Sequence, residues 1–198
     1  MKKLLSLALL LLASASSQVM AQGSITGVFN ESATGTTSAT VFCDPRNGFA
    51  NLTDLTWRLD AGVTTGLVTF RSGDTPYAVT SATSSSGTVV YFTNTGTSVA
   101  ASEHVIVYDT SAGDYYLRYT SAAATTSVTV TQSISPALTT DDKIWSVIGS
   151  VSRAVPNVNS LTAAVNIWLP QGRPTAVTLE GNTTSCAISV NGVSSPYR

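Results

Sequence analysis

The chain is a succession of short runs rich in β-branched residues, and turn residues separate one run from the next. Valine and threonine dominate these runs, and branching at Cβ suits the pleated surface of a strand. Gly, Pro, Asn, Asp and Ser gather between the runs, where they favour turns. No stretch repeats apolar residues at i, i+3, i+4 and i+7 for long enough to predict a helix. The sequence therefore predicts an all-β protein.

Short strands follow one another along almost the whole chain. Many short antiparallel strands with frequent turns are typical of sandwiches and closed barrels. We expect a β-sandwich, of the jelly-roll or immunoglobulin-like Greek-key type. The predicted strands span residues 24–29, 39–43, 53–59, 65–71, 77–82, 88–93, 104–108, 115–120, 127–134, 143–150, 163–169, 175–179 and 187–191.

The clearest single unit is a hairpin within residues 104–119. Two β-rich runs flank a polar loop that contains glycine, which is the pattern of a hairpin. In the first run Val105 and Val107 point to one side, whereas Ile106 and Tyr108 point to the other. A strand with bulky residues on both faces is usually central in its sheet. We therefore expect this strand to be covered on both sides.

The N-terminus has the features of a secretory signal peptide. Lys2 and Lys3 precede an apolar run at residues 4–13, and small residues lead up to Ala21. We predict a signal peptide at residues 1–21, cleaved before Gln22. The apolar run is shorter than the ~20 residues that a membrane-spanning helix needs. We therefore expect the mature protein to be secreted, periplasmic or on the cell surface, with no membrane span after cleavage.

The mature chain of residues 22–198 has a length that suits one domain. We expect a single β-sandwich domain. Pro136 interrupts the strand pattern within residues 134–140, because proline cannot donate a hydrogen bond to a neighbouring strand. This stretch is therefore the weakest point of the pattern and the place where we would put a boundary between two sub-lobes.

Two cysteines, Cys43 and Cys186, lie near opposite ends of the mature chain. An even number of cysteines in an exported protein favours a disulfide. A bond between them would bring the first and last thirds of the chain side by side, and closing so long a loop would stabilise the fold by about 5 kcal/mol. The alternative is a pair of buried thiols, because cysteine is often buried without a disulfide.

Charged residues are few, at 11% of the chain, and the formal net charge is −1. Loss of Lys2 and Lys3 with the signal peptide leaves Lys143 as the one lysine of the mature chain. Nucleic-acid binding needs clustered Lys and Arg to neutralise phosphates. We therefore expect no nucleic-acid partner, and we expect hydroxyl groups to keep the surface soluble.

The sequence lacks the usual combinations of catalytic and metal-binding residues. His104 is the one histidine, and no Gly-x-Ser-x-Gly motif is present to form a nucleophile elbow. One histidine and two distant cysteines do not have the spacing of a zinc site. The loop at residues 109–114 lacks the dense carboxylates of a calcium loop. We expect no enzyme activity, no metal and no cofactor, and a site assembled only in the fold is the alternative.

Tryptophan and tyrosine are candidates for ligand contacts. Trp57, Trp145 and Trp168 lie among apolar residues, so we expect all three in the core.

Tyr115, Tyr116 and Tyr119 follow the hairpin loop and are the best candidates for an exposed binding patch. We consider two functions. The first is a non-catalytic structural or interaction protein of the cell envelope or an extracellular assembly, which would contact itself or an envelope protein through exposed strand edges. The second is a carbohydrate- or ligand-binding module.

Overall fold

The computed structural model describes residues 27–35, 38–44, 49–59, 65–81, 87–93, 99–134, 137–156, 161–169, 172–181 and 185–195. The signal peptide expected at residues 1–21 lies outside these ranges. Within them the chain forms twelve strands and no helix, so the all-β prediction is confirmed. The strands are β1 (Gly27–Gly35), β2 (Ser38–Cys43), β3 (Phe49–Leu59), β4 (Thr65–Ala78), β5 (Val89–Tyr91), β6 (His104–Asp109), β7 (Asp114–Ala124), β8 (Ser127–Val130), β9 (Lys143–Pro156), β10 (Leu161–Leu169), β11 (Thr175–Gly181) and β12 (Cys186–Ser195).

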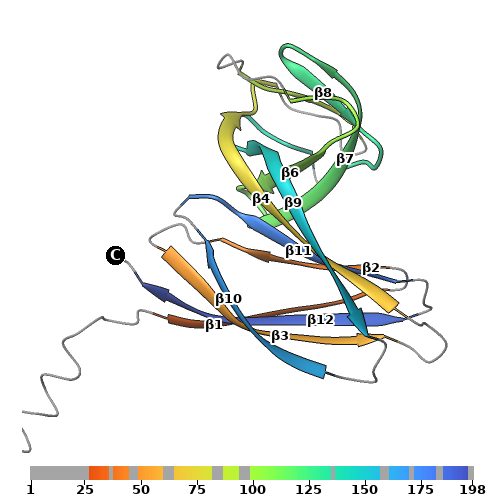
Figure 1. Ribbon diagram of the computed structural model, residues 1–198. Helices are drawn as coiled ribbons and strands as arrows, with labels where there is room; N and C mark the ends of the chain where they lie inside the picture. Colours follow the sequence, from red (N-terminus) through yellow and green to blue (C-terminus); the bar gives the residue numbers. More distant parts are fainter. Residues whose placement is uncertain are drawn as a thin grey trace, which may run out of the picture.

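The strands make two sheets in which the named strands pair antiparallel. The smaller sheet has the order β1-β12-β3-β10, and the larger has the order β2-β11-β4-β9-β6-β7-β8-β5. Figure 1 shows that the larger sheet does not stay flat. Its first half faces the smaller sheet in a lower lobe, and its second half curls into a half-barrel that forms an upper lobe.

The lower lobe is held together by an apolar core between the two facing sheets. In β2, Ala39, Val41 and Cys43 are buried in this core, whereas Thr40 and Phe42 point to the opposite face of the sheet. Alternation of this kind follows from the two-residue period of a strand. The same core takes side chains from both sheets, among them Leu52, Trp57, Leu59, Val68, Val155, Leu169, Leu179 and Ile188.

The upper lobe has a core of its own, enclosed by the curled half of the larger sheet. Tyr77 from β4 and Phe92 after β5 lie at its centre, with ring centroids 5.2 Å apart. The other buried members are Val79, Val90, Val99, Val105, Val107, Val128, Val130, Ile134, Leu138 and Ile144.

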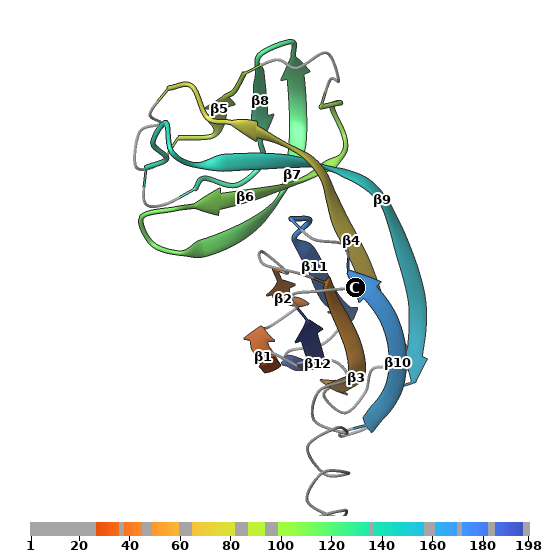
Figure 2. The ribbon, with the colours of Figure 1, turned by 90° about the vertical axis from the view of Figure 1, so that its left-hand side faces the viewer.

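Strands β4 and β9, of 14 residues each, run through both lobes and join them. Their register shifts between Arg71 and Gly73, and again between Gly73 and Pro76. A Cβ atom on Gly73 would lie 3.0 Å from the Cβ of Trp145, so glycine allows the close approach of the two strands here. Such irregularities bend strands, and Figure 2 shows the pair curving from one lobe into the other.

The junction between the lobes therefore lies inside β4 and β9 and not at residues 134–140. Ile134 and Leu138, on either side of the undescribed Pro136, are both fully buried in the upper core. These two residues therefore belong to the upper lobe.

The predicted hairpin is confirmed as β6 and β7, which pair from His104 with Tyr119 to Asp109 with Asp114. Strand β6 lies between β7 and β9, and both of its faces are covered. Val105 and Val107 point into the upper core, whereas Ile106 packs at the junction of the lobes.

The loop of this hairpin is stabilised by Asp109, whose side chain is buried. Its Oδ1 accepts hydrogen bonds from the backbone N–H of Ser111 and Ala112 and from the Ser111 hydroxyl, at 2.7 to 3.0 Å. Burial by itself raises the pKa of Asp109, but these hydrogen bonds outweigh it and hold the pKa below its ordinary value. The role of the Asp109 carboxylate is thus to stabilise the turn.

The structure corrects the expected disulfide, because Cys43 and Cys186 are not bonded to each other. Cys43 ends β2, whereas Cys186 faces Gly35, which lies against Ser38 at the start of β2. A strand of that length spans roughly 17 Å, and a disulfide needs Cα atoms within about 7 Å. Both side chains are buried in the lower core at positions about one strand length apart.

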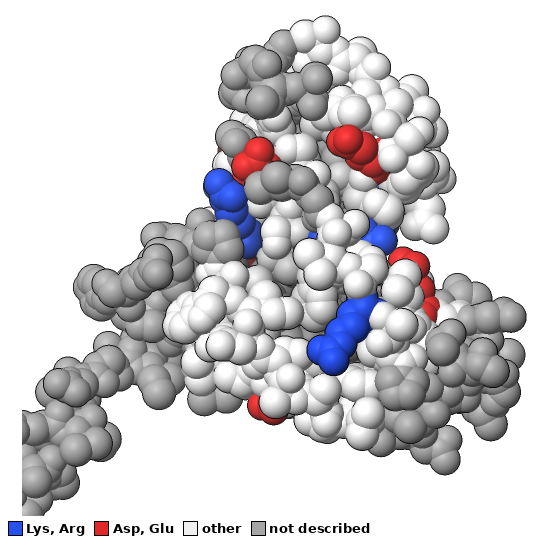
Figure 3. All heavy atoms as spheres, viewed as in Figure 1, with Lys and Arg blue, Asp and Glu red and all other residues white. Residues whose placement is uncertain are grey.

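The outer face of the smaller sheet carries a row of hydroxyl groups beside the exposed Arg58. Ser32, Ser189, Thr56 and Thr162 face one another in register across its four strands. The hydroxyl oxygens of Thr56 and Thr162 are 2.8 Å apart. Figure 3 shows few charged side chains on the face that it draws.

Candidate functional site

A groove of about 330 Å³ lies where the upper lobe approaches the outer face of β2 and β11. We call it the inter-lobe groove. Strand β7 forms one wall and β2 the other, and the strong curl of the larger sheet brings them together although four strands separate them in the sheet order. Its lining residues are Ser38, Thr40, Phe42, His104, Tyr115, Tyr116, Leu117, Arg118, Tyr119, Thr131, Gln132, Thr178 and Glu180.

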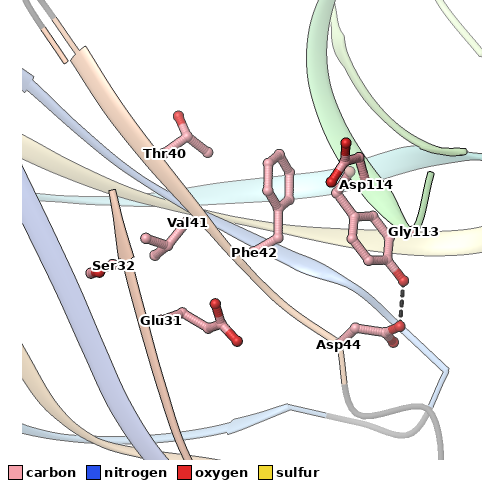
Figure 4. A pocket seen from close by; sticks show the side chains of 9 residues that line it. Glu31, Ser32, Thr40, Val41, Phe42, Asp44, Gly113 and Asp114 are labelled. Carbon is pink, nitrogen blue, oxygen red and sulfur yellow. Dashed lines mark hydrogen bonds between the residues drawn. The ribbon is translucent and has the colours of Figure 1, made fainter. Parts of the chain in front are cut away.

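Tyr115 is the central contact between the two walls. Its ring stacks on Phe42 with centroids 5.6 Å apart, and it lies 4.6 Å from Tyr108 and 6.2 Å from Trp145. Its hydroxyl donates a hydrogen bond to Asp44, just after β2 (Figure 4). Aromatic pairs at these separations attract each other beyond the effect of area burial. Tyr115 therefore holds the hairpin against the lower lobe.

The other two predicted tyrosines also line the groove, but the three do not form one flat platform. Tyr116 packs against the upper core, and the guanidinium of Arg118 lies 5.1 Å from its ring centroid. Tyr119 is 42% exposed, and its ring meets His104 edge-on at 5.2 Å. Of the three, Tyr119 is the one whose ring is open to solvent and to a ligand.

A second hollow, of about 540 Å³, lies on the other side of the Phe42–Tyr115 contact (Figure 4). Glu31, Asp44 and Asp114 give it an acidic lining. Over the described ranges, no three His, Cys, Asp or Glu side chains come close enough to hold a metal ion.

Behind the inter-lobe groove lies a buried arginine. Arg71 faces Ala176 in register, and Ala176 faces Phe42, so Arg71 points to the same face as the groove wall. Its Nη2 is 3.6 Å from Oε1 of Glu180. The side chain of Arg71 is 10% exposed and that of Glu180 is 45% exposed. The ion pair is thus buried at the arginine and open at the carboxylate.

His104 lies close enough to this pair to feel its charges. Burial lowers the pKa of His104 below its ordinary value, and the positive charge of Arg71 lowers it further, while Glu180 opposes this effect. His104 is therefore neutral at pH 7 and accepts or donates hydrogen bonds without adding charge.

Three buried N–H groups at this junction have no hydrogen-bond partner among the described residues. They are Nη1 of Arg71, Nε of Arg118 and Nε1 of Trp145. A buried polar group without a partner costs about 1–3 kcal/mol, and more when it is charged. The junction is therefore rich in donors that lack acceptors.

Sequence reasoning found the tyrosines but missed Phe42, Arg71 and Glu180. These three come from β2, β4 and β11, so only the sheet order brings them together. The available signal was weak: Arg71 ends one predicted strand and Glu180 directly follows another, and charged residues are uncommon in strands.

A third hollow, of about 680 Å³, opens between β9 and β10 at the side of the lower lobe. We call it the edge groove. Val151 is 72% exposed and Leu161 is 40% exposed, so the lower core reaches solvent here. The apolar lining comprises Leu55, Trp57, Val68, Phe70, Val151, Ala154, Val155, Leu161, Ala163, Ala164, Val165 and Ile167, and Arg153 is the one charged lining residue that the structure describes.

Both strands beside the edge groove have an unpaired side. Strand β10 pairs with β3 and ends the smaller sheet. Strand β9 pairs with β6 through residues 143–146, and its residues 150–156 pair with β4 alone among the described strands. Backbone groups at such edges can pair with another chain.

Trp168 is not in the core, which corrects the sequence prediction. Trp57 and Trp145 are 4% and 5% exposed, as expected, but Trp168 is 64% exposed. In β10, Ile167 faces Leu52 and Leu169 faces Ala50 on the core side, so alternation turns Trp168 outward.

Among the described residues, no helix is long and apolar enough to span a membrane. No protein-family model matches the sequence, and no curated protein matches it.

Comparison with solved structures finds distant likenesses. The mitogen of Yersinia pseudotuberculosis has a TM-score of 0.27 and 8% identity, over 85% of this chain and 86% of that one. VP17, a capsid protein of bacteriophage P23-77, has a TM-score of 0.25 and 14% identity, over 85% and 98%. A Bacillus licheniformis lipase has a TM-score of 0.21 and 9% identity, over 85% of this chain and 22% of that longer chain. TM-scores this low carry no argument about function.

Proposed function

We propose that this is an exported, non-catalytic interaction protein that assembles with copies of itself through the edge of β10. The observation that carries the proposal is an uncharged edge strand of nine residues beside an apolar groove. Natural proteins usually protect long edge strands with charges, prolines or short length. Strand β10, with the sequence LTAAVNIWL, has neither a charge nor a proline.

The other described edges are protected in one of these ways. Strand β1 carries Glu31, and β5 has only three residues. Strand β2 also lacks charge and proline but has only six residues, and the open side of β9 at residues 150–156 carries Arg153 and Pro156. Strand β10 thus stands out as an edge on which another strand can pair without displacing anything described.

A second copy of the chain fits this edge because the edge is self-complementary. A twofold axis places the same patch on both subunits, so a self-complementary patch must not bring like charges together across the axis. The uncharged β10 meets that condition. Two β10 strands paired antiparallel would join two four-stranded sheets and cover Val151 and Leu161 of each copy. Burial of this apolar surface supplies the driving force.

We infer further that the lower lobe is a β-sandwich of the jelly-roll type. Counted in chain order within this lobe, its strands lie in the orders 1-8-3-6 and 2-7-4-5. A jelly roll has two four-stranded sheets built from two Greek keys, and these interleaved orders support that assignment. The upper lobe is then an insertion between the fourth and fifth strands.

Export is part of the proposal and is supported by the N-terminal pattern of residues 1–21. The low proportion of charged residues, 11% of the chain, and hydroxyl pairs such as Thr56 and Thr162 are consistent with this part of the proposal.

The test places one lysine on either edge of the smaller sheet. Asn166 and Ser32 are both exposed and lie on the edge strands β10 and β1. We expect the mature protein to be a dimer in analytical ultracentrifugation at micromolar concentration. A lysine at position 166 would bring two like charges together across the twofold axis, so Asn166→Lys should be monomeric.

Ser32→Lys is the matched control and should stay dimeric. A dimer of Asn166→Lys as tight as that of the control, or a monomeric parent protein at all concentrations, would refute the assignment to β10.

A further inference from the structure

The inter-lobe groove offers a ligand more hydrogen-bond donors than its own acceptors satisfy. Its volume of about 330 Å³ is at the lower end of the range for small-molecule sites. Aromatic and hydroxyl side chains share the lining, with Tyr119 as the exposed ring and Thr40 and Thr178 on the opposite wall. The combination of a flat apolar surface and polar groups is suited to a ring-shaped, oxygen-rich molecule.

The charge at the groove favours an anion with one negative charge. Arg118 lines the groove and Arg71 lies behind it, whereas Glu180 is the one carboxylate among the lining residues. His104 is neutral at pH 7, so these groups sum to a single positive charge. A monoanion balances that charge, and a dianion exceeds it.

The unpartnered donors lie on this same junction. Arg71 is more than nine-tenths buried, and its Nη1 has no hydrogen-bond partner among the described residues. Nε1 of Trp145 is also buried without a hydrogen-bond partner among the described residues. Trp145 packs with Ala176, which faces Arg71. A guanidinium matches a carboxylate in shape and charge, because its parallel N–H groups meet both oxygens.

Glu180 is the group that such a ligand would replace. It is 3.6 Å from Arg71, which is longer than a hydrogen bond, and its side chain is 45% exposed. A ligand carboxylate that enters the groove therefore competes with a weak and partly solvated partner.

We propose that the inter-lobe groove binds a saccharide that carries a single carboxylate. The carboxylate would lie against Arg71, the sugar ring against Tyr119, and the sugar hydroxyls against Thr40, Thr178 and Gln132.

The test uses the three tryptophans as reporters in the full exported protein, labelled with ¹⁵N-tryptophan. The probes are glucuronate and glucose, which differ by one carboxylate. Glucuronate should shift the indole N–H signal of Trp145 in a saturable manner. It should not shift the signal of Trp168, which is exposed on the smaller sheet far from the groove. Glucose should bind at least about tenfold more weakly, because it cannot form the charge-assisted hydrogen bonds to Arg71.

Two substitutions should act in opposite directions. Arg71→Gln should abolish glucuronate binding, because it removes the guanidinium. Glu180→Gln should tighten binding several-fold, because it removes the competing carboxylate. Arg153→Gln, in the edge groove, is the matched control and should leave the affinity unchanged. The signal of Trp57, buried in the lower core, reports whether each variant is folded; if Arg71→Gln does not fold, Glu180→Gln carries the test.

Equal affinity for glucose and glucuronate would overturn the proposal, as would weaker binding by Glu180→Gln. Inorganic phosphate is a further arm: displacement of glucuronate by phosphate at equal concentration would show a general anion site and overturn the assignment to a saccharide. Failure of Trp145 to respond to any probe would also overturn it.

Discussion

Cys43 illustrates how little of a residue's chemistry is visible before the fold is known. From the sequence, export and an even cysteine count favoured a bond to Cys186. The register of the strands excludes this disulfide, because the two side chains enter the same core about one strand length apart. The alternation that buries both side chains was readable from the sequence, but the relative offset of their strands was not. The same applies to Trp168, whose orientation depends on its partner strand.

The two thiols should therefore be present and unreactive in the folded protein. Burial, with a smaller effect from the negative charge of Glu31, raises the pKa of Cys43 to about 12. Since the thiolate is the reactive form, Cys43 should resist Ellman's reagent at pH 8. We expect two thiols per chain to react in 6 M guanidinium without reductant, and fewer than about 0.2 in native buffer. A protein that yields no thiols in guanidinium would contain the disulfide after all.

At the scale of single elements, sequence reasoning performed best where neighbours in sequence are neighbours in space. The β6–β7 hairpin was predictable because its turn and both runs are contiguous. The burial of both faces of β6 was predictable as well, because bulky residues occupy both of them. The position of the lobe junction was not predictable, because it depends on register shifts inside β4 and β9 that leave only Gly73 as a local sign.

The hairpin loop depends on a residue that is distant in sequence, Asp142. Its carboxylate is buried and accepts hydrogen bonds from the backbone N–H groups of Thr110 at 2.7 Å and Thr139 at 2.6 Å. Asp142→Ala should lower the free energy of unfolding by about 2–4 kcal/mol, because it leaves these buried donors unpaired. Urea denaturation measures this loss.

The neighbouring substitution Asp141→Ala is the control. Asp141 is exposed, and its contribution to Thr110 comes from the backbone carbonyl, which the substitution retains. We expect a change within about 0.5 kcal/mol. Equal losses of unfolding free energy in the two variants would show that the buried carboxylate of Asp142 does not stabilise the loop.

For the whole molecule, fold class was accessible from the sequence and arrangement was not. Strand-forming runs and turns sufficed for an all-β prediction. The inter-lobe groove needed three-dimensional information, because its walls are at positions near 40, 115 and 180. No local sequence pattern shows that these segments lie side by side, because the curl of the larger sheet brings them together. The tyrosines were found because aromatic residues stand out, whereas Arg71 matters only through its burial.

Tyr115 should couple the two lobes. Tyr115→Ala removes the ring that contacts Phe42, Tyr108 and Trp145, and we expect a loss of about 3 kcal/mol. The weakened junction should also split the calorimetric unfolding transition into two, one for each core.

Tyr115→Phe keeps the ring and removes the hydroxyl that donates to Asp44, so we expect a loss of about 1 kcal/mol and a single transition. If both variants lose the same free energy, the hydroxyl and not the ring joins the lobes.

The pairing of β1 with β12 determines how the molecule responds to tension. Gly27 faces Ser194, so the two strands that lie outermost in the sequence start and finish at the same end of the smaller sheet. A force that pulls these ends apart breaks the backbone hydrogen bonds between β1 and β12 one pair after another. It does not load all of them at once in shear. The lower lobe should therefore peel apart under a small pull, while the upper lobe, which lies outside the line of force, stays folded longer.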